Sequence, residues 1–248
     1  MNLTGNTILV TGGSSGIGKA LAESLHKLGN QVIITGRNVP ALSLVTSANP
    51  GMRSEELDIS NPLAIQAFGR KIVAEFPDLN VLINNAGIQF RENLKNQEGH
   101  VEAMEALITT NLLGPLRLTA ALLPHLLTRD SSTVINVTSG LGFVPGTWVP
   151  TYSATKAAHH SYTVSLRRQM RDTSVEVLEL IPPYVQTNLG PGHGSDPAAM
   201  PLAEFIDEVI AILRSGPEEG EIVVDRCLHL RRAVENGNFE EIFHRLNG

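Results

Sequence analysis

The sequence predicts an α/β fold: a doubly wound parallel β-sheet of about seven strands with helices on both faces. Two observations lead to this prediction. Short runs rich in Val and Ile alternate with amphipathic stretches along the chain, and no break in composition marks a domain boundary. A chain of 248 residues, 42% of them hydrophobic, is also long enough to bury one large core. We therefore expect a single domain over residues 1–248.

Seven strands and five long helices are expected in alternation. The strands are Thr7–Thr11, Gln31–Thr35, Arg53–Asp58, Val81–Asn84, Thr133–Thr138, Ser174–Ile181 and Glu221–Val224. The helices are Ile17–Leu28, Pro62–Glu75, His100–Leu127, Ser153–Arg171 and Leu202–Ser215, with a short helix inside Arg231–Gly248. Strands that alternate with helices form parallel sheets, and ligands of such sheets bind beyond the carboxyl ends of the strands. Loops at 88–95, 140–150 and 184–201 are expected at that edge, the last as a mobile cover or a plain surface connection.

Composition and charge exclude several classes of protein. A net charge of −6 argues against a nucleic-acid partner. The single cysteine, Cys227, rules out a disulfide framework or thiolate metal cluster, so we expect a buried thiol, no metal and a cytoplasmic location. The apolar stretch Leu107–Leu127 is interrupted by polar residues and a proline, so it is interpreted as a buried helix and no membrane partner is expected.

A glycine-rich turn joins the first strand to the first helix. It reads Thr11-Gly-Gly-Ser-Ser-Gly-Ile-Gly18, with the spacing G-x3-G-x-G. Gly12 permits a tight turn, Gly16 allows a pyrophosphate to approach the backbone, and Gly18 lets the helix lie close to the strand. The free amides and the positive dipole end of the helix then favour phosphate. A glycine turn alone is a weak signal, but its place between a strand and a helix supports a dinucleotide site.

The residues after the second strand bear on which dinucleotide binds. An NAD site usually carries an acid there for the ribose hydroxyls, but this chain reads Ile34-Thr35-Gly36-Arg37-Asn38. The guanidinium of Arg37 can pair with a 2′-phosphate, so NADP is expected in preference to NAD. The alternative is that Arg37 is a solvated loop charge.

Tyr152 and Lys156 lie four residues apart, which places a phenol and an ammonium on one face of a helix. We expect the ammonium to lower the pKa of Tyr152 and make it a usable acid/base. Such a pair is common by chance, but Ser139 closes the strand before it and can polarise a carbonyl. Asn84-Asn85-Ala86-Gly87 ends another strand at the same edge, and Asn111 sits mid-helix at a cost in propensity, which suggests a special task.

Taken together, these motifs resemble the short-chain dehydrogenase/reductase family, in its short single-domain branch with a Rossmann-type sheet. The resemblance runs from Leu3 to about Val224. It rests on the glycine turn, Asp58, the Asn84–Gly87 segment, Asn111, Ser139, Tyr152-x3-Lys156 and Pro182-Pro-Tyr-Val-Gln-Thr187.

The resemblance implies a role for each matching residue. Tyr152 would be the general acid/base, Ser139 would polarise the carbonyl, Lys156 would hold the nicotinamide ribose, and Asn111 would anchor a water that relays protons. The implied cofactor-binding residues are Gly12, Ser14, Ser15, Gly16, Ile17, Gly18, Arg37, Asp58, Ile59, Asn84, Ala86, Gly87, Tyr152, Lys156 and Thr187. The family usually has Pro-Gly where this chain has Pro182-Pro183, which leaves the backbone near Thr187 less certain.

The implied function is hydride transfer between NADP(H) and a small carbonyl or alcohol. The alternatives are a non-catalytic NADP-binding sensor or scaffold, and a sugar-nucleotide epimerase or dehydratase, for which 248 residues leave little room. The substrate loops carry Phe90, Leu141, Phe143, Trp148 and Tyr184, which either form an apolar pocket or only pack the loops; Gln89, Arg91 and His193 could instead meet a polar substrate.

Two further expectations concern contacts between subunits. His159 and His160 are adjacent, so they do not share a helical face and are expected at the surface or a subunit contact rather than on a metal. The family commonly pairs the helices at His100–Leu127 and Ser153–Arg171 between subunits, which implies a homodimer or homotetramer.

Overall fold

The protein is described by a computed structural model covering residues 1–96, 100–190, 194 and 196–248. Its centre is a seven-stranded sheet in the order β3-β2-β1-β4-β5-β6-β7, with every neighbouring pair parallel. The strands are β1 (Thr7–Thr11), β2 (Gln31–Gly36), β3 (Arg53–Glu56), β4 (Leu79–Asn84), β5 (Ser132–Val137), β6 (Val175–Ile181) and β7 (Glu221–Val223). The order reverses direction beside β1, and this switch point is where ligands of such sheets bind.

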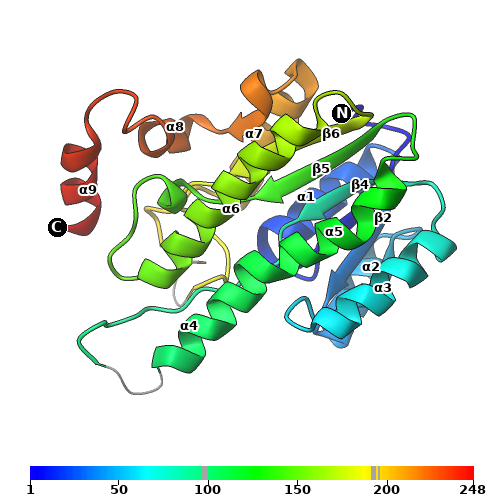
Figure 1. The fold of residues 1–248 in the computed structure, drawn as a ribbon, viewed down its shortest axis with the longest axis horizontal. Helices are drawn as coiled ribbons and strands as arrows, with labels where there is room; N and C mark the ends of the chain where they lie inside the picture. Colours follow the sequence, from blue (N-terminus) through cyan, green and yellow to red (C-terminus); the bar gives the residue numbers. More distant parts are fainter. Residues whose placement is uncertain (97–99, 191–193, 195) are drawn as a thin grey trace.

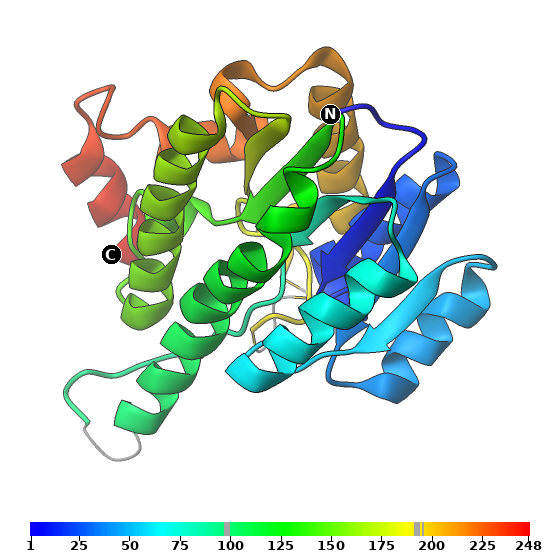
Figure 2. The same ribbon diagram turned by 45° about the vertical axis from the view of Figure 1, so that its right-hand side comes forward.

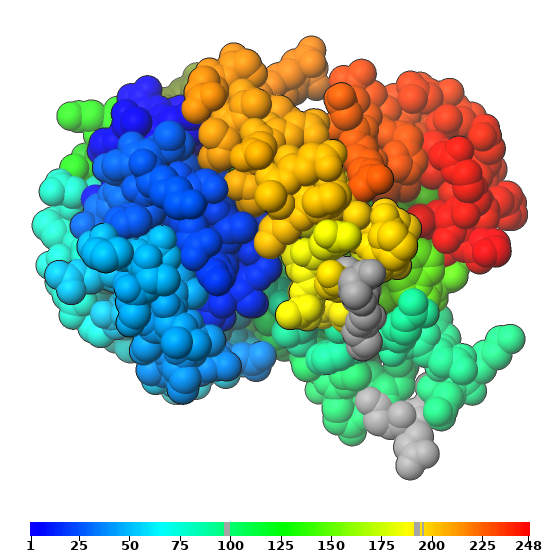
Figure 3. Space-filling model, turned by 180° about the vertical axis from the view of Figure 1, so that it is seen from behind, coloured from blue at the N-terminus to red at the C-terminus, as the bar shows by residue number. Residues whose placement is uncertain are grey.

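Helices cover both faces of the sheet, as the sequence predicts (Figures 1 and 2). They are α1 (Gly16–Lys27), α2 (Val39–Ala48), α3 (Pro62–Glu75), α4 (His100–Ile108), α5 (Gly114–Leu126), α6 (Pro150–Met170), α7 (Leu202–Ser215), α8 (Asp225–Arg231) and α9 (Phe239–Asn247). One core cluster joins the sheet to α1, α2 and α7, which lie on the face seen in Figure 3. A second cluster joins the opposite face to α3, α5 and α6. Burial of these two apolar layers is the main stabilising contribution to the fold.

Helix α2 is the main element that the sequence pattern missed. Its ten residues include no charged side chain, and Leu44 is 74% exposed, so hydrophobicity does not alternate as in an amphipathic helix. Its start is fixed locally instead. The side chain of Asn38 accepts a hydrogen bond from the amide of Ala41 at 3.0 Å, and Pro40 occupies the first turn.

The long helix expected over His100–Leu127 is interrupted. Five residues, Thr109–Leu113, form a π-helical turn, η1, between α4 and α5. The stretch His100–Leu126 has the length and composition of a membrane-crossing helix. However, α5 packs against α3 and β4 and buries Leu118, Leu122 and Leu126 completely, so it is a core helix of this fold.

The segment after β7 forms a small separate layer beside α6 (Figure 1). Ile242 of α9 and Leu230 of α8 pack with Val144, and Phe239 and Phe243 complete the cluster. The short C-terminal helix that the sequence predicts is therefore α9, whereas α8 was not predicted.

Candidate active site

A cavity of about 1150 Å³ opens at the carboxyl edge of the sheet. It extends from the turn after β1, past the ends of β2 and β4, to the start of α6 and the C-terminal helices. The sheet positions it, because the carboxyl ends of parallel strands meet at one edge.

The glycine turn forms one wall of this cavity. Gly12 and Gly16 adopt φ of +68° and +54°, which side chains rarely tolerate. A Cβ on Gly18 would lie 2.2 Å from Nδ2 of Asn85, so a glycine is needed there for packing. The first turn of α1 contains no acidic residue, and the hydroxyl of Ser15, its N-cap residue, forms no capping bond. The helix therefore presents its first amides to the cavity, an arrangement that suits a phosphate group.

The ends of β1 and β4 are held together by hydrogen bonds. The hydroxyl of Thr11 accepts bonds from the amides of Asn85 and Ala86, both at 3.0 Å. Nδ2 of Asn85 donates to the carbonyl oxygen of Thr11 at 2.9 Å. The two motifs recognised in the sequence thus form one rigid wall. Ser14, Ser15, Ile17, Ala86 and Gly87 line the cavity with Gly12 and Gly16.

Asn84 and Asn85 differ in their placement. Asn84, expected beside the adenosine ribose, is 3% exposed and does not line the cavity. Its Nδ2 donates to Asn136 at 2.8 Å and to Thr119 at 2.9 Å, behind the sheet edge. Asn85, which the sequence analysis did not single out, lines the cavity in its place. Successive side chains of a strand point to opposite faces, so only one of two adjacent asparagines faces the cavity. The sequence pattern does not show which of the two it is.

The far end of the cavity is lined by Arg37, Asp58 and Ile59. Partial burial tends to raise the pKa of Asp58, but hydrogen bonds from Ser60 and the positive charge of Arg37 outweigh it, so this pKa lies below its usual value. Arg37 is therefore close enough to Asp58 to influence its charge. Arg37 is exposed, and the sequence at the end of β2, Gly36-Arg37, offers no acid there.

Ser139, Tyr152 and Lys156 meet at the opposite end of the cavity. Tyr152 is 5% exposed, and burial raises its pKa to about 12, although a hydrogen bond with Ser139 acts in the other direction. The expectation of a lowered pKa was wrong for this structure, because burial has the larger effect. The ammonium lies 5.7 Å from the centre of the Tyr152 ring, and its Nζ donates to the carbonyl oxygen of Val137 at 2.8 Å. Tyr152 is accordingly held in its protonated form.

Lys156 is 4% exposed, and its environment favours a loss of charge. Burial lowers its pKa to about 8, while the negative charge of Glu179 opposes this shift. At neutral pH the side chain is still mainly an ammonium.

Asn111 lies in the π-helical turn η1, where helices often carry functional residues. Its side chain accepts a hydrogen bond from the amide of Ile88 and donates one to the carbonyl oxygen of Ile88, both at 2.8 Å. It therefore fixes the start of the 88–95 loop. Asn111 is 1% exposed and lies behind the cavity wall rather than in it.

The segment after β6 lines the cavity through Pro182, Pro183 and Thr187. The carbonyl oxygen of Pro182 accepts a bond from the amide of Gly140 at 3.0 Å, which ties this segment to the residue after Ser139. The Cβ of Thr187 would lie 3.5 Å from a Cβ on Gly16, so Thr187 approaches the glycine turn despite the second proline. The segment then pairs with Met200, as Gln186 donates to its carbonyl oxygen at 2.9 Å.

The part of the cavity near Tyr152 is mainly apolar. Ile88, Leu141 and Trp148 line it and pack in one cluster with Tyr152. The other large apolar or aromatic residues that line the cavity include Phe90, Tyr184, Leu189, Leu230 and Leu246. Gln89 and Arg91 also line it, Phe143 does not, and His193 lies outside the described residues. The sequence analysis missed Leu230 and Leu246 because they come from α8 and α9, far along the chain. Asn247 holds α9 in place, as its side chain accepts from the amide of Thr147 at 2.6 Å and donates to Pro145 at 3.1 Å.

The two adjacent histidines differ in exposure, and only His159 is buried. His159 is 2% exposed, and burial and the charge of Lys156 lower its pKa to about 3. His160 is paired with the buried carboxylate of Glu179. The expectation of a surface position was therefore wrong for His159, and a contact of either histidine with a second subunit stays a prediction. Cys227 is fully buried, as expected, and burial raises the pKa of its thiol to about 12.

Comparison with known proteins identifies the family of this chain. Residues 6–197 match the model of the short chain dehydrogenase family. An uncharacterised oxidoreductase of Bacillus subtilis, DltE, is 38% identical over 251 residues, which cover 100% of this chain and 98% of the relative. An uncharacterised oxidoreductase of Staphylococcus saprophyticus is 33% identical and covers 76% of this chain and 82% of its own length.

Solved structures show the same fold. A short chain dehydrogenase from Burkholderia cenocepacia, in complex with NADP, superposes with a TM-score of 0.85, covers 99% of both chains and is 25% identical. A metagenomic short-chain oxidoreductase in complex with NADP gives a TM-score of 0.73 at 28% identity, over 89% of this chain and 97% of its own. Fold, site and relatives together define an oxidoreductase built on a Rossmann-type sheet. The chain belongs to the short-chain dehydrogenase/reductase family.

Proposed function

We propose that the protein reduces the carbonyl group of a small, mainly apolar molecule with NADPH, and that Tyr152 is the general acid. The observation that carries this proposal is the placement of Ser139, Tyr152 and Lys156 in one cavity with the glycine turn. A non-catalytic sensor would have no need of all three groups at the end of a dinucleotide-sized cavity.

The residues of the cavity fit a nicotinamide dinucleotide. The uncapped start of α1, with Ser14, Ser15, Gly16 and Ile17, would receive the pyrophosphate. Asp58, Ile59 and Ala86 would contact the adenosine, and Lys156 and Thr187 would contact the nicotinamide end. When bound, NADPH supplies a hydride to the substrate.

NADPH is proposed over NADH because of the charge at the end of β2. Arg37 and Asn38 line the cavity at this point, and the hydroxyl of Ser14 lies 3.5 Å from the position of a Cβ on Gly36. A 2′-phosphate would place two negative charges against this guanidinium. The Burkholderia and metagenomic relatives, which are in complex with NADP, support this choice.

The side chains divide the reaction between them. With a hydride supplied by bound NADPH, the phenol of Tyr152 would donate its proton to the carbonyl oxygen, which would give an alcohol and a tyrosinate. The hydroxyl of Ser139 stabilises the oxygen by hydrogen bonding, and the nearby ammonium of Lys156 stabilises the tyrosinate until it is reprotonated. Asn111 holds the Ile88 loop in place beside these groups.

The substrate is proposed to be apolar around its carbonyl group. Ile88, Leu141 and Trp148 pack beside Tyr152, and Leu230 and Leu246 also line the cavity; apolar walls of this kind favour apolar ligands. Gln89 and Arg91, at the rim, could receive a polar tail. Pairing of chains into a dimer or tetramer stays a prediction.

The test is NADPH oxidation by the purified protein with a panel of apolar and polar aldehydes and ketones. We expect turnover with the apolar members. Tyr152→Phe should lower kcat by about 100- to 10,000-fold, the usual contribution of a general acid, while NADPH still binds. An unchanged kcat in this variant would remove Tyr152 from the mechanism, and no turnover with any carbonyl would remove the proposed function.

A further inference from the structure

A row of polar side chains crosses the sheet beneath α6. Asn84 of β4, Asn136 of β5, Glu179 of β6 and Glu221 of β7 are register partners in turn, so their side chains point to the same face. Asn136 and Glu179 are completely buried. Both polar atoms of the buried side-chain amide of Asn136 are hydrogen-bonded: it accepts from Asn84 at 2.8 Å and donates to Thr163 of α6 at 2.9 Å. Glu179 is a buried carboxylate, which is costly unless it is paired.

Glu179 is bonded to the neighbours of two residues of the active site. Its Oε1 accepts a hydrogen bond from the hydroxyl of Thr138 at 2.7 Å, and Thr138 directly precedes Ser139. Nδ1 of His160 lies 3.0 and 2.9 Å from its two oxygens. His160 follows Lys156 by one helical turn, so it lies on the same side of α6.

The carboxylate also acts on Lys156 by charge. Lys156 donates its hydrogen bond to a neutral group, the carbonyl oxygen of Val137. Burial lowers the pKa of Lys156 to about 8, and among the described charged groups Glu179 is the one that raises it. The other titratable groups of α6 near Lys156 are Tyr152, protonated up to about pH 12, His159, which is neutral above about pH 3, and His160, which is paired with Glu179. None of them supplies a negative charge at neutral pH.

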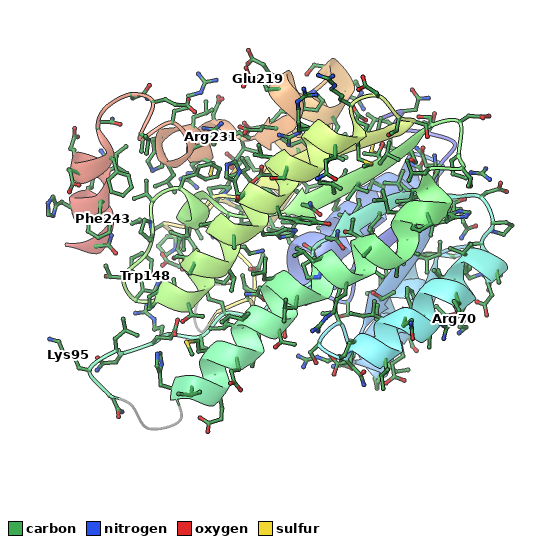
Figure 4. All side chains as sticks on the ribbon, viewed as in Figure 1. Arg70, Lys95, Trp148, Glu219, Arg231 and Phe243 are labelled. Atoms are coloured by element: carbon green, nitrogen blue, oxygen red, sulfur yellow. The ribbon has the colours of Figure 1, made fainter. Side chains whose placement is uncertain are left out.

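The pair formed by His160 and Glu179 is flanked by β7 and α8. Glu221 lies next to the pair, but its two oxygens are bonded to Arg231 at 2.6 and 2.9 Å. The guanidinium of Arg231, labelled in Figure 4, lies 4.9 Å from the centre of the Phe143 ring, and this ring lies 4.6 Å from that of His160. His160, Glu179 and Glu221 are spaced closely enough to hold a metal ion, but Glu179 is hydrogen-bonded to His160 and Glu221 is paired with Arg231. Arg231 thus balances Glu221, whereas Glu179 acts on Lys156.

We propose that Glu179, held by His160 and Thr138, is a positioning residue that keeps Lys156 charged and fixes the strand end that carries Ser139. This inference rests on the proposed function, since it assigns a partner to the same active site. It places the negative charge needed to balance the buried ammonium on the strand next to the catalytic serine.

The first experiment compares pH profiles of carbonyl reduction for the wild type and Glu179→Gln. Glutamine keeps the shape and an acceptor for Thr138 but removes the charge. A carboxylate near a cation shifts its pKa by about 1 to 3 units, so we expect the loss of kcat/KM at high pH to begin about 1 unit lower or more. The matched control is Glu176→Gln, the same substitution on the exposed side of β6, which should leave the profile unchanged.

A folded Glu179→Gln protein with the wild-type profile would overturn the proposal. If this variant does not fold, as judged by circular dichroism, Glu179→Asp decides. It keeps the charge but withdraws it by one methylene, so a smaller shift of the same sign is expected, and an unchanged profile would again overturn the proposal.

Binding of NADPH separates this proposal from the proposed function. The chain has one tryptophan, Trp148, which lines the cavity, so its fluorescence reports binding without turnover. If the wild type binds NADPH but reduces no carbonyl, the proposed reaction fails. The role of Glu179 is then decided by whether Glu179→Gln loses NADPH affinity at a lower pH than the wild type. A coincident pH dependence of binding would refute that role.

Discussion

Replacement of Arg37 by alanine should convert a preference for NADPH into near indifference between the two dinucleotides. Arg37 follows β2 directly, lines the cavity and is close enough to Asp58 to lower its pKa. The variant removes a positive charge without opening the core, because this side chain is exposed. The fold should therefore be kept while recognition of the 2′-phosphate is lost.

The size of the effect follows from the exposure of the pair. A hydrogen bond to a charged group contributes about 1.5 to 3 kcal/mol, and solvent around Arg37 places this pair at the lower end. Because about 1.4 kcal/mol changes an affinity tenfold, Kd for NADPH should rise about 10- to 30-fold. NADH has no 2′-phosphate, so its Kd should change by less than about threefold.

The assay is quenching of Trp148 fluorescence by NADPH and by NADH, with kcat/KM for both measured in parallel. The matched control is Arg53→Ala, which removes the same charge from an exposed position on β3 that does not line the cavity. Equal losses for the two cofactors in Arg37→Ala, or an equal effect of the control, would refute the reasoning. Stronger dependence of NADPH binding on salt than of NADH binding would support it.

Two further results are expected. Because burial lowers the pKa of Lys156 to about 8, the charged form is lost as the pH rises through this value; kcat/KM for reduction should be flat below about pH 7 and fall up to tenfold per unit above about pH 9. Tyr152, with a pKa of about 12, adds no second loss in that range, and a profile still flat at pH 10 would contradict this assignment. Gly18→Ala would push a methyl group to 2.2 Å from Nδ2 of Asn85, so calorimetry should show a loss of about 1 to 3 kcal/mol in stability together with weaker NADPH binding. Unchanged stability and binding would mean that the contact between α1 and the β4 end is not tight.

The sequence predicted the sheet and most of the cavity because these depend on local patterns. Alternating apolar runs mark strands, and the glycine turn, Ser139, Tyr152 and Lys156 each sit at a strand end or on a helix face that periodicity can locate. Helix α3 and helix α7 begin and end where the pattern predicted, since proline or a cap at the start and a charged outer face define them.

Features set by contacts between distant parts of the chain could not be predicted. Leu246 lines the cavity only because Asn247 ties α9 to the loop before α6. The pKa of Tyr152 rises because of burial, which no spacing of residues reveals. Likewise, His160 faces Glu179 across elements separated by 19 residues, and the sequence marks neither as a partner of the other. The asparagine inside an apolar helix marked Asn111 as unusual in the sequence. It did not indicate that the helix forms a π-helical turn there.

The loop after Ser139 packs directly against α8. At Gly140 a Cβ would lie 2.7 Å from Leu230 and 2.9 Å from the sulfur of Cys227, so this loop is supported by residues far along the chain. The ends of β1 and β4, which carry the glycine turn and Asn85, are instead tied to each other. Removal of α8 and α9 should therefore loosen the serine loop more than the glycine turn, so the two sides of the cavity depend on the C-terminal helices to different degrees.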